Sequence, residues 1–251
     1  MEDEKKKQPI FPHFDFAAGE VLLIDKPYKW TSFDVVGKIR NSLKPLKLKV
    51  GHAGTLDPLA TGLLIVCTGK RTKTIDELQA QEKEYIGTFT LGATTPSYDL
   101  ETTPDSLFDI THLTEQDLHR ATSIFIGPIE QYPPVHSAVK MQGERLYEKA
   151  RRGESVELKP RNVIIHEFEL TRIAFPDIEF RVVCSKGTYI RSLAHDFGKA
   201  LGVGAYLSQL RRTRSGNFQI KDAWDVLELS NHIRSLKEQG QLLINDNKEH
   251  P

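Results

Sequence analysis

One carboxylate stands in a stretch of chain whose composition suits a ligand-binding loop. The stretch is GHAGTLDPLATG, residues 51–62, and Asp57 is its only acid. Its three glycines permit tight turns and close approach of a ligand to the backbone, and Pro58 disfavours helix at Asp57. A carboxylate on an irregular loop can serve as a nucleophile or as a proton acceptor. An Asp-Pro pair is also typical of an ordinary turn, so the loop by itself does not establish a site.

A cation with an unusual placement provides a second candidate. In CSKGTYIRSL, residues 184–193, a strand is expected to end, a glycine turn to follow and a helix to begin near Tyr189. Arg191 then lies in the first helical turn, where a positive charge opposes the helix dipole at a cost of about 0.3–1 kcal/mol. The placement suggests an anionic partner, and Asp57 is one candidate. A bidentate guanidinium would fix the orientation of that carboxylate and stabilise its charge. The alternative is a solvent-facing arginine.

Two further side chains can work beside a reactive carboxylate. Tyr85 follows Lys83 at the start of a strand, and a tyrosine there can relay a proton or stack on a base. Ordinary sheet packing is the other reading of Tyr85. His52 can contact a base or be a loop histidine with internal partners.

No pattern in the chain points to a metal or to a nucleotide cofactor. Zinc-type Cys/His spacing, a glycine-rich phosphate loop after a strand and GxSxG do not occur. The two cysteines, Cys67 and Cys184, lie in apolar strand-like runs and are predicted to be buried, reduced thiols. With no recognisable secretory or membrane-spanning segment, we expect a cytoplasmic protein.

The charge is balanced overall but unevenly distributed. Residues 31–74 carry eight Lys/Arg and two Asp, and residues 181–221 carry eight Lys/Arg and one Asp, whereas residues 92–130 carry seven acids and one Arg. The two basic zones could form one phosphate-binding face, or they could be ordinary solvated surface.

The elements that must position these residues are mixed without a regular βαβ alternation, which predicts an α+β fold with a mainly antiparallel sheet. Residues 51–62 are expected to be irregular, and residues 1–18 to form a mobile tail that Phe11, Phe14 and Phe16 can dock. Strands are expected at 21–25, 63–68, 83–91, 161–172 and 178–184. Helices are expected at 31–43, 70–79, 114–127, 145–152, 190–201 and 223–236.

Five motifs, taken in order, resemble those of the TruB family, the bacterial tRNA pseudouridine synthases that act on the T-loop. They are GEVLLIDKP (19–27), GHAGTLDPLATG (51–62), KEY (83–85), SAVK (137–140) and SKGTYIR (185–191). The 51–62 motif is the most specific of the five, and the resemblance covers residues 19–225. It implies a pseudouridine synthase fold, tRNA as the partner and isomerisation of uridine 55, with no cofactor.

The resemblance also implies roles for particular residues. Asp57 would be the essential aspartate, and Arg191 would pair with it. Tyr85 would stack on the target base and take part in proton transfer, and His52 would sit against the flipped-out nucleotide. Three further residues would line the pocket: Lys26, Tyr189 and Leu210.

The end of the chain departs from the pattern of many family members, which carry a C-terminal RNA-binding PUA domain. Only 26 residues follow Asp225, so we expect residues 226–251 to form a short helical extension without that domain. The expectation is a catalytic domain at 19–225 that acts as a monomer without an obligatory protein partner.

The chemistry itself stays open at this point. Isomerisation breaks the glycosidic bond, turns the uracil and rejoins it through C5, after extrusion of the base from its stack at a cost of a few kcal/mol. Asp57 could attack C1′, attack the base, or remove a ribose proton to give a glycal. Basic side chains near 38–49 and 211–214 would hold the RNA backbone.

Three other functions compete with this hypothesis. They are a catalytically silent RNA-binding protein of the same fold, a guide-RNA-dependent relative, and a nucleoside hydrolase or nuclease. The last is disfavoured because the loop offers one carboxylate where a glycosidase typically uses two.

Overall fold

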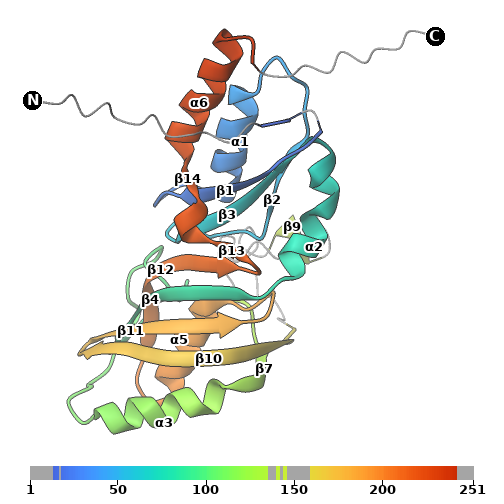
Figure 1. The fold of residues 1–251 in the computed structure, drawn as a ribbon. Coiled ribbons are helices and arrows are strands. Elements are labelled where there is room, and N and C mark those ends of the chain that lie inside the picture. The colour runs from blue at the N-terminus through green and yellow to red at the C-terminus, as the bar shows by residue number, and fades with distance from the viewer. Residues whose placement is uncertain (1–13, 17, 135–139, 142–143, 146–158, 242–251) are drawn as a thin grey trace, which may run out of the picture.

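The computed structural model describes residues 14–16, 18–134, 140–141, 144–145 and 159–241. Its centre is a ten-stranded sheet with the order β14-β1-β3-β12-β4-β11-β10-β7, in which β2 pairs with β3 and β13 with β12 (Figure 1). The β1–β14 and β3–β12 pairs are parallel, and the other pairs of this sheet are antiparallel. The expected α+β class with a mainly antiparallel sheet is confirmed.

The elements have the following bounds. The strands of the main sheet are β1 Val21–Lys26, β2 Val50–Ala53, β3 Thr61–Thr68, β4 Lys83–Leu91, β7 Gly127–Gln131, β10 Arg161–Ala174, β11 Asp177–Cys184, β12 Ala205–Ser215, β13 Phe218–Gln219 and β14 Trp224–Asp225. Two small hairpins pair β5 Ala93–Thr94 with β6 Ser106–Leu107, and β8 Lys140–Met141 with β9 Glu144–Arg145. The helices are α1 Ser32–Ser42, α2 Ile75–Ala80, α3 Glu115–Phe125, α5 Ile190–Ala200 and α6 Val226–Glu238, with 3-10 turns η1 Gly69–Thr74 and η2 Ile220–Asp222.

Reciprocal caps fix the starts of two helices where the sequence predicts them. Thr31 accepts a hydrogen bond from the backbone of Asp34, and the Asp34 carboxylate accepts one from the backbone of Thr31. Thr114 and Asp117 form the same capping box on α3. Each box satisfies amide groups that the first helical turn leaves without partners, which holds the helix start in one place.

Two apolar cores lie at opposite ends of the sheet. At one end α1 and α6 lie side by side against β1 and β3, and at the other α5 and α3 pack on β4, β10, β11 and β12 (Figure 1). Phe14 and Phe16 are buried in the first core, so this part of the expected tail is docked, whereas Phe11 lies outside the described residues. Both cysteines are buried and unpaired, as predicted.

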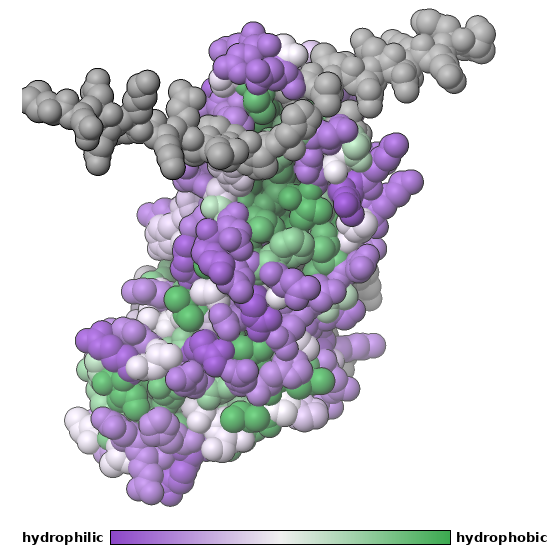
Figure 2. Space-filling model, viewed as in Figure 1, coloured by the Kyte–Doolittle hydropathy of each residue, from purple (hydrophilic) through white to green (hydrophobic). Residues whose placement is uncertain are grey.

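Outside these cores, the surface of the molecule is mostly hydrophilic. Figure 2 shows hydrophilic side chains over most of the visible face, with a larger apolar patch in the upper half of the molecule and smaller apolar groups in the lower half. No helix in the described part of the chain has the length and apolar character needed to cross a lipid bilayer.

Several local expectations were wrong. Residues 50–53 form β2 because they pair with β3, with His52 opposite Val66, so the irregular loop is only 54–60. The helix expected at 70–79 is a 3-10 turn followed by α2. The central strand β12 was not predicted at all, because its alternation is obscured by the basic run at 211–214. The helix expected at 145–152 lies outside the described residues except for Arg145 in β9.

Candidate active site

The loop that carries Asp57 is held by the segment between β1 and α1. The Ser32 hydroxyl donates to the Leu56 carbonyl at 3.1 Å and accepts from the Leu56 amide at 2.9 Å. The Lys29 amide donates to the Pro58 carbonyl at 2.9 Å, and the Ala60 amide donates to the Asp57 carbonyl at 3.1 Å. These bonds fix the backbone on both sides of Asp57, so its carboxylate is held by the loop and does not depend on solvent for its position.

Lys26 supports the same loop from inside the protein. Its ammonium is fully buried and donates to the carbonyls of Pro27 at 3.0 Å, Trp30 at 2.5 Å and Pro58 at 3.3 Å. Burial lowers the pKa of Lys26 to about 8, against the opposing effect of the nearby Asp57 carboxylate. Lys26 therefore anchors the loop backbone.

Arg191 lies in the first turn of α5, as the sequence predicts. Its Nε lies 2.9 Å from Asp57 Oδ2 and 3.6 Å from Asp99 Oδ2, and its Nη1 donates to the Ser97 carbonyl at 3.1 Å. The predicted Arg191–Asp57 pairing is confirmed, but the bidentate form is wrong. The contact is an ion pair through Nε without the alignment of a hydrogen bond, because the guanidinium is shared among three oxygen partners.

The two members of this ion pair differ in their exposure to solvent. The Arg191 side chain is 4% exposed, whereas the Asp57 side chain is 39% exposed. The arginine is thus an internal group, and the carboxylate is the member that a substrate can reach. Gln131 holds the start of α5 at this point, since its side-chain amide bonds the backbone N–H and C=O of Tyr189 at 2.7 and 3.0 Å.

Asp99 belongs to the site although the sequence gave no reason to single it out. It lies in the acidic region 92–130, and its side chain is 5% exposed. A bridge between Asp99 and Leu207 brings it beside β12, and therefore close to Arg191. No local pattern carries this information, because the contact joins segments that lie far apart along the chain.

Tyr85 and Arg212 face each other in the sheet register. Arg212 on β12 lies opposite Tyr85 on β4 and opposite Gly62 on β3. The Arg212 side chain is fully buried and donates to the carbonyls of Leu63 at 2.6 Å and Gly54 at 3.0 Å. Burial raises the pKa of Tyr85 above its usual value, against the opposing effect of Arg212. The phenol is therefore neutral near pH 7 and retains a proton that it can relay.

The arginines of the basic run at 211–214, which the sequence suggested as phosphate-binding residues, all have partners within the protein. Besides the buried Arg212, Arg211 makes two bonds to Asp25 at 3.1 and 2.6 Å, and Arg214 bonds Glu82 at 2.7 Å. Because these arginines lie on a central strand, their side chains meet acids and carbonyls of neighbouring strands.

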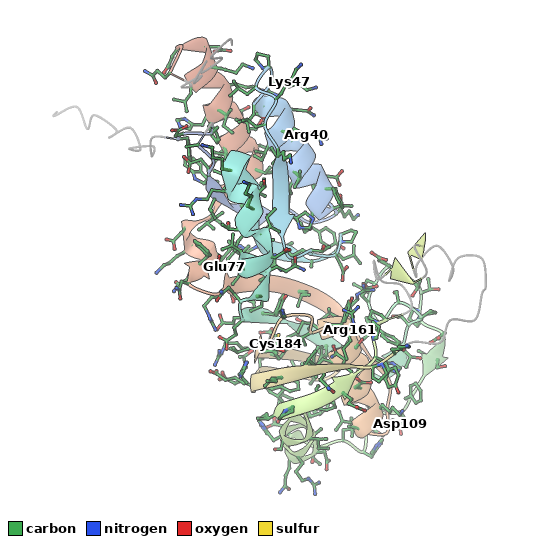
Figure 3. All side chains as sticks on the ribbon, turned by 90° about the vertical axis from the view of Figure 1, so that its right-hand side faces the viewer. Arg40, Lys47, Glu77, Asp109, Arg161 and Cys184 are labelled. Carbon is green, nitrogen blue, oxygen red and sulfur yellow. The ribbon has the colours of Figure 1, made fainter. Side chains whose placement is uncertain are left out.

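The other basic zone keeps exposed cations. Arg40 and Lys47 lie on α1 and on the segment that follows it, in the upper half of the molecule (Figure 3). Lys44 and Lys49 are exposed in the same segment. Residues 38–49 are therefore a candidate phosphate-binding surface.

A cavity of about 780 Å³ opens over the Asp57 carboxylate. Among the residues singled out from the sequence, five line it: Asp57, Tyr85, Tyr189, Arg191 and Leu210. Polar groups from the β4, β10, β11 and β12 region complete its wall: Lys83, Arg161, Asn162, Ser185, Lys186, Thr188 and Arg212. The volume lies within the range of small-molecule sites and accommodates a nucleotide. The guanidinium of Arg161, which is labelled in Figure 3, lies 5.8 Å from the centre of the Tyr189 ring.

Two predicted residues do not line this cavity. Lys26 is buried beneath the loop, and His52 packs edge-to-face against Phe33 with ring centroids 5.5 Å apart. Burial, with a smaller effect of Arg212, lowers the pKa of His52, so its imidazole is neutral near pH 7. In the described part of the chain, no three His, Cys, Asp or Glu side chains come together as a metal site would require.

Comparisons with known proteins agree with this geometry. Residues 40–190 match the TruB family pseudouridylate synthase N-terminal domain, and residues 191–244 match the tRNA pseudouridylate synthase B C-terminal domain. The chain is 58% identical over 217 residues to tRNA pseudouridine synthase B of Flavobacterium johnsoniae, with 84% of this chain and 95% of that protein covered. It is 52% identical over 238 residues to the protein of the same name from Parabacteroides distasonis, covering 93% of this chain and all of that protein.

Solved structures show the same fold in a longer protein. A chain from a crystal structure of a Cbf5-Nop10-Gar1 complex superposes with a TM-score of 0.69 at 33% identity, covering 90% of this chain. A chain from a structure of an H/ACA RNP bound to a substrate RNA containing 2'-deoxyuridine gives 0.67 at 30% identity, covering 92% of this chain. This chain spans 57% of the length of each of those two. The likeness confirms the pseudouridine synthase fold. With both family domains matched over most of its length, the chain belongs to the TruB family of pseudouridylate synthases.

Proposed function

We propose that this chain converts uridine 55 in the T-loop of tRNA to pseudouridine, with Asp57 as the essential carboxylate. The chain is an isomerase of the tRNA pseudouridine synthase class. One observation carries the assignment of the residue: Asp57 is the substrate-accessible member of an ion pair with a buried arginine, and it lines a cavity of nucleotide size.

The reaction needs the groups that this cavity supplies. The bond between C1′ and N1 breaks, the uracil turns, a bond forms between C1′ and C5, and the proton on C5 is lost while N1 gains one. The Asp57 carboxylate can open the sequence by attack at C1′, by attack at the base, or by removing a ribose proton. The cavity wall keeps the released uracil beside the sugar, so that recombination competes with escape.

Tyr85 and Arg191 serve the carboxylate in different ways. The neutral phenol of Tyr85 can stack on the uracil and relay the C5 proton, which general acid–base catalysis requires. Arg191 holds the Asp57 charge and its orientation through a buried contact, where an ion pair is less screened by water.

The remaining predicted residues contact or position the substrate. Tyr189 and Leu210 line the cavity and are placed to contact the nucleotide after it is flipped out of its stack. Lys26 acts through the loop that it anchors. His52 lies outside the cavity and acts at the surface beside it, against the RNA that surrounds the flipped nucleotide.

We further propose that the chain acts on tRNA directly, as a cytoplasmic monomer without a guide RNA or an obligatory protein partner. Residues 19–225 are the proposed catalytic region, and α6 packs against it through the core that it shares with α1.

The test is incubation of the purified chain with an unmodified tRNA transcript, followed by chemical mapping of pseudouridine. We expect product in the T-loop with wild-type protein and none with Asp57→Asn, while the variant still binds tRNA because the substitution conserves size and removes only the charge. Absence of product with wild type would favour a silent RNA-binding protein. Activity of Asp57→Asn close to wild type would remove Asp57 from the mechanism.

A further inference from the structure

One aromatic side chain beside the site is exposed although the fold does not need it there. Phe33 lies in the first turn of α1 and is 67% exposed. The packing of this helix is carried by its other face, through Val35, Val36 and Ile39, which are buried. Most of the ring is therefore accessible to a partner outside the chain.

The ring is held in place before any partner arrives. His52 packs edge-to-face against it at 5.5 Å with an interplanar angle of 85°, a favourable aromatic arrangement. The backbone of Phe33 lies inside the capping box of Thr31 and Asp34, which fixes the helix start. A ring held this way loses little freedom on binding, which favours affinity.

Phe33 is linked to the cavity through the residue before it, Ser32. Its neighbour Ser32 makes the two hydrogen bonds to Leu56, and Leu56 lines the cavity together with Thr55 and Asp57. A group that stacks on Phe33 therefore lies beside a nucleotide that occupies the cavity.

The charge around Phe33 suits a nucleic acid. Lys29 is exposed, and its backbone has φ of 65°, a left-handed conformation held by the hydrogen bond to the Pro58 carbonyl. This conformation is costly for a non-glycine residue and persists only where contacts fix it. The Lys29 backbone is thus fixed to the Asp57 loop, and its ammonium lies 5.6 Å from the centre of the exposed Tyr28 ring. The adjacent acid, Asp34, has its carboxylate engaged with Thr31.

We propose that Phe33, supported by His52, is a stacking platform for one unpaired base of the tRNA loop that neighbours the flipped uridine. The inference rests on the proposed function and adds a specific contact to it. Stacking on an aromatic ring holds a base of any identity, so the platform contributes affinity and keeps the loop open, and it does not select sequence.

The first experiment measures binding of an unmodified tRNA transcript to the full chain. Phe33→Ala should raise Kd about 5- to 150-fold, the range that loss of one stacked base predicts, at unchanged melting temperature. Phe33→Tyr should stay within about twofold of wild type because it keeps the ring, and Phe33→Leu should resemble Ala because it is apolar without a ring. Ile124→Ala is the matched control, because Ile124 is a similarly exposed apolar side chain on α3, at the other end of the sheet.

The salt dependence separates stacking from charge. Phe33→Ala should leave the slope of log Kd against log salt concentration unchanged, since no phosphate contact is lost. A Phe33→Leu variant that binds like wild type, or a Phe33→Ala variant with a changed slope, would overturn the platform.

A second readout locates the contact. A T-stem-loop hairpin with 5-iodouridine at one loop position at a time should crosslink, on irradiation, to the peptide that contains Phe33 from one position near the target, and not in Phe33→Ala. Crosslinks confined to other peptides would refute the proposal. If wild type makes pseudouridine but Kd is insensitive to Phe33, only the platform fails; if wild type makes none, the proposed function fails.

Discussion

At the residue scale, the site is built around an asymmetric ion pair. Arg191 is buried and shared among Asp57, Asp99 and the Ser97 carbonyl, whereas Asp57 faces the cavity. An arginine surrounded in this way cannot move away from the carboxylate without losing its other partners. The carboxylate is therefore presented to the substrate in one orientation.

Arg191→Lys should lower kcat at neutral pH by about 100-fold, because an ammonium is a point charge that cannot reach three separate oxygens from one planar group. Arg191→Ala should lower it further, since two neighbouring carboxylates would lose their shared cation. Single-turnover rates with a tRNA transcript measure both effects. Arg172→Lys, at an exposed pair with Glu179, is the control and should be silent. Equal activity of the Lys variant and wild type would contradict the shared-cation role.

Tyr85→Phe keeps the aromatic face and removes the hydroxyl. We expect folded protein with wild-type tRNA affinity and a turnover reduced by about 10²–10⁴-fold, the range for loss of a proton-transfer group. Single-turnover kinetics separate this loss from product release. Tyr206→Phe, on the neighbouring strand and outside the cavity, should behave as wild type. An unchanged rate for Tyr85→Phe would leave Tyr85 with stacking alone.

At the element scale, β12 assembles the site. It runs between β3 and β4. Arg212 on β12 therefore lies opposite Gly62 of β3, just after the Asp57 loop, and opposite Tyr85 of β4. The strand comes from the C-terminal half of the chain and inserts between two elements from the N-terminal half. Its close contact with β3 depends on Gly62, where φ is 100° and the backbone of Arg212 passes directly over the Cα.

Gly62→Ala tests that contact. A Cβ at this position would lie 2.3 Å from the Arg212 carbonyl oxygen, so the two strands would have to separate. Gly127 is a matched control, since its φ is also 100° but a Cβ there would meet nothing within 4 Å. In each Ala variant the positive φ should lower the free energy of unfolding by about 1–2 kcal/mol. In Gly62→Ala the clash with Arg212 should lower it by about 2 kcal/mol more.

Urea unfolding measures these stabilities, and turnover measures the effect on the site. Gly62→Ala should also reduce kcat, because separation of β3 from β12 displaces Arg212, whereas Gly127→Ala should keep wild-type turnover. Equal destabilisation of the two variants would show that the strands can accommodate a methyl group.

At the scale of the whole molecule, the loop that carries Asp57 connects the two cores. Leu56 and Ala60 of the Asp57 loop pack in the core of α5 and α3, while the strand that follows them, β3, contributes to the core of α1 and α6. The loop is thus fixed by both ends of the molecule.

Replacing Lys44, Lys47 and Lys49 together by Ala should weaken tRNA binding and reduce the salt dependence. Each phosphate contact that is lost should lower the slope of log Kd against log salt concentration by about 0.7–0.9. Filter binding between about 50 and 200 mM salt measures the slope. A slope identical to that of wild type would show that these three lysines make no contact with phosphates of the tRNA.

The control removes the same charge elsewhere. Arg120, Arg172 and Lys199 lie on α3, β10 and α5, around the other core, and are exposed. Their joint replacement by Ala should leave the slope unchanged, because the effect depends on contact with phosphates and not on net charge alone.

The sequence by itself determined the local features and singled out the candidate reactive groups. Capping residues placed α1 and α3, a two-residue alternation placed β4, and the glycine-rich motif around Asp57 pointed to the loop and to the family. The Arg191–Asp57 pair was also predicted, because a cation at a helix start suggests an anionic partner and the family resemblance implied that this partner is Asp57. Each of these inferences depends on interactions among residues close in the chain or on a motif.

The tertiary structure alone decided which groups share a site and which cations face solvent. Nothing in the residues near Asp99 says that it approaches Arg191, and nothing in the run 211–214 says that Arg212 is buried or that Arg211 pairs with Asp25. Lys26 and His52 were expected in the pocket, but one lies beneath the loop and the other beside it. Burial and pairing between distant segments depend on where β12 enters the sheet, and strand order is set by the packing of the entire chain, which no local pattern encodes.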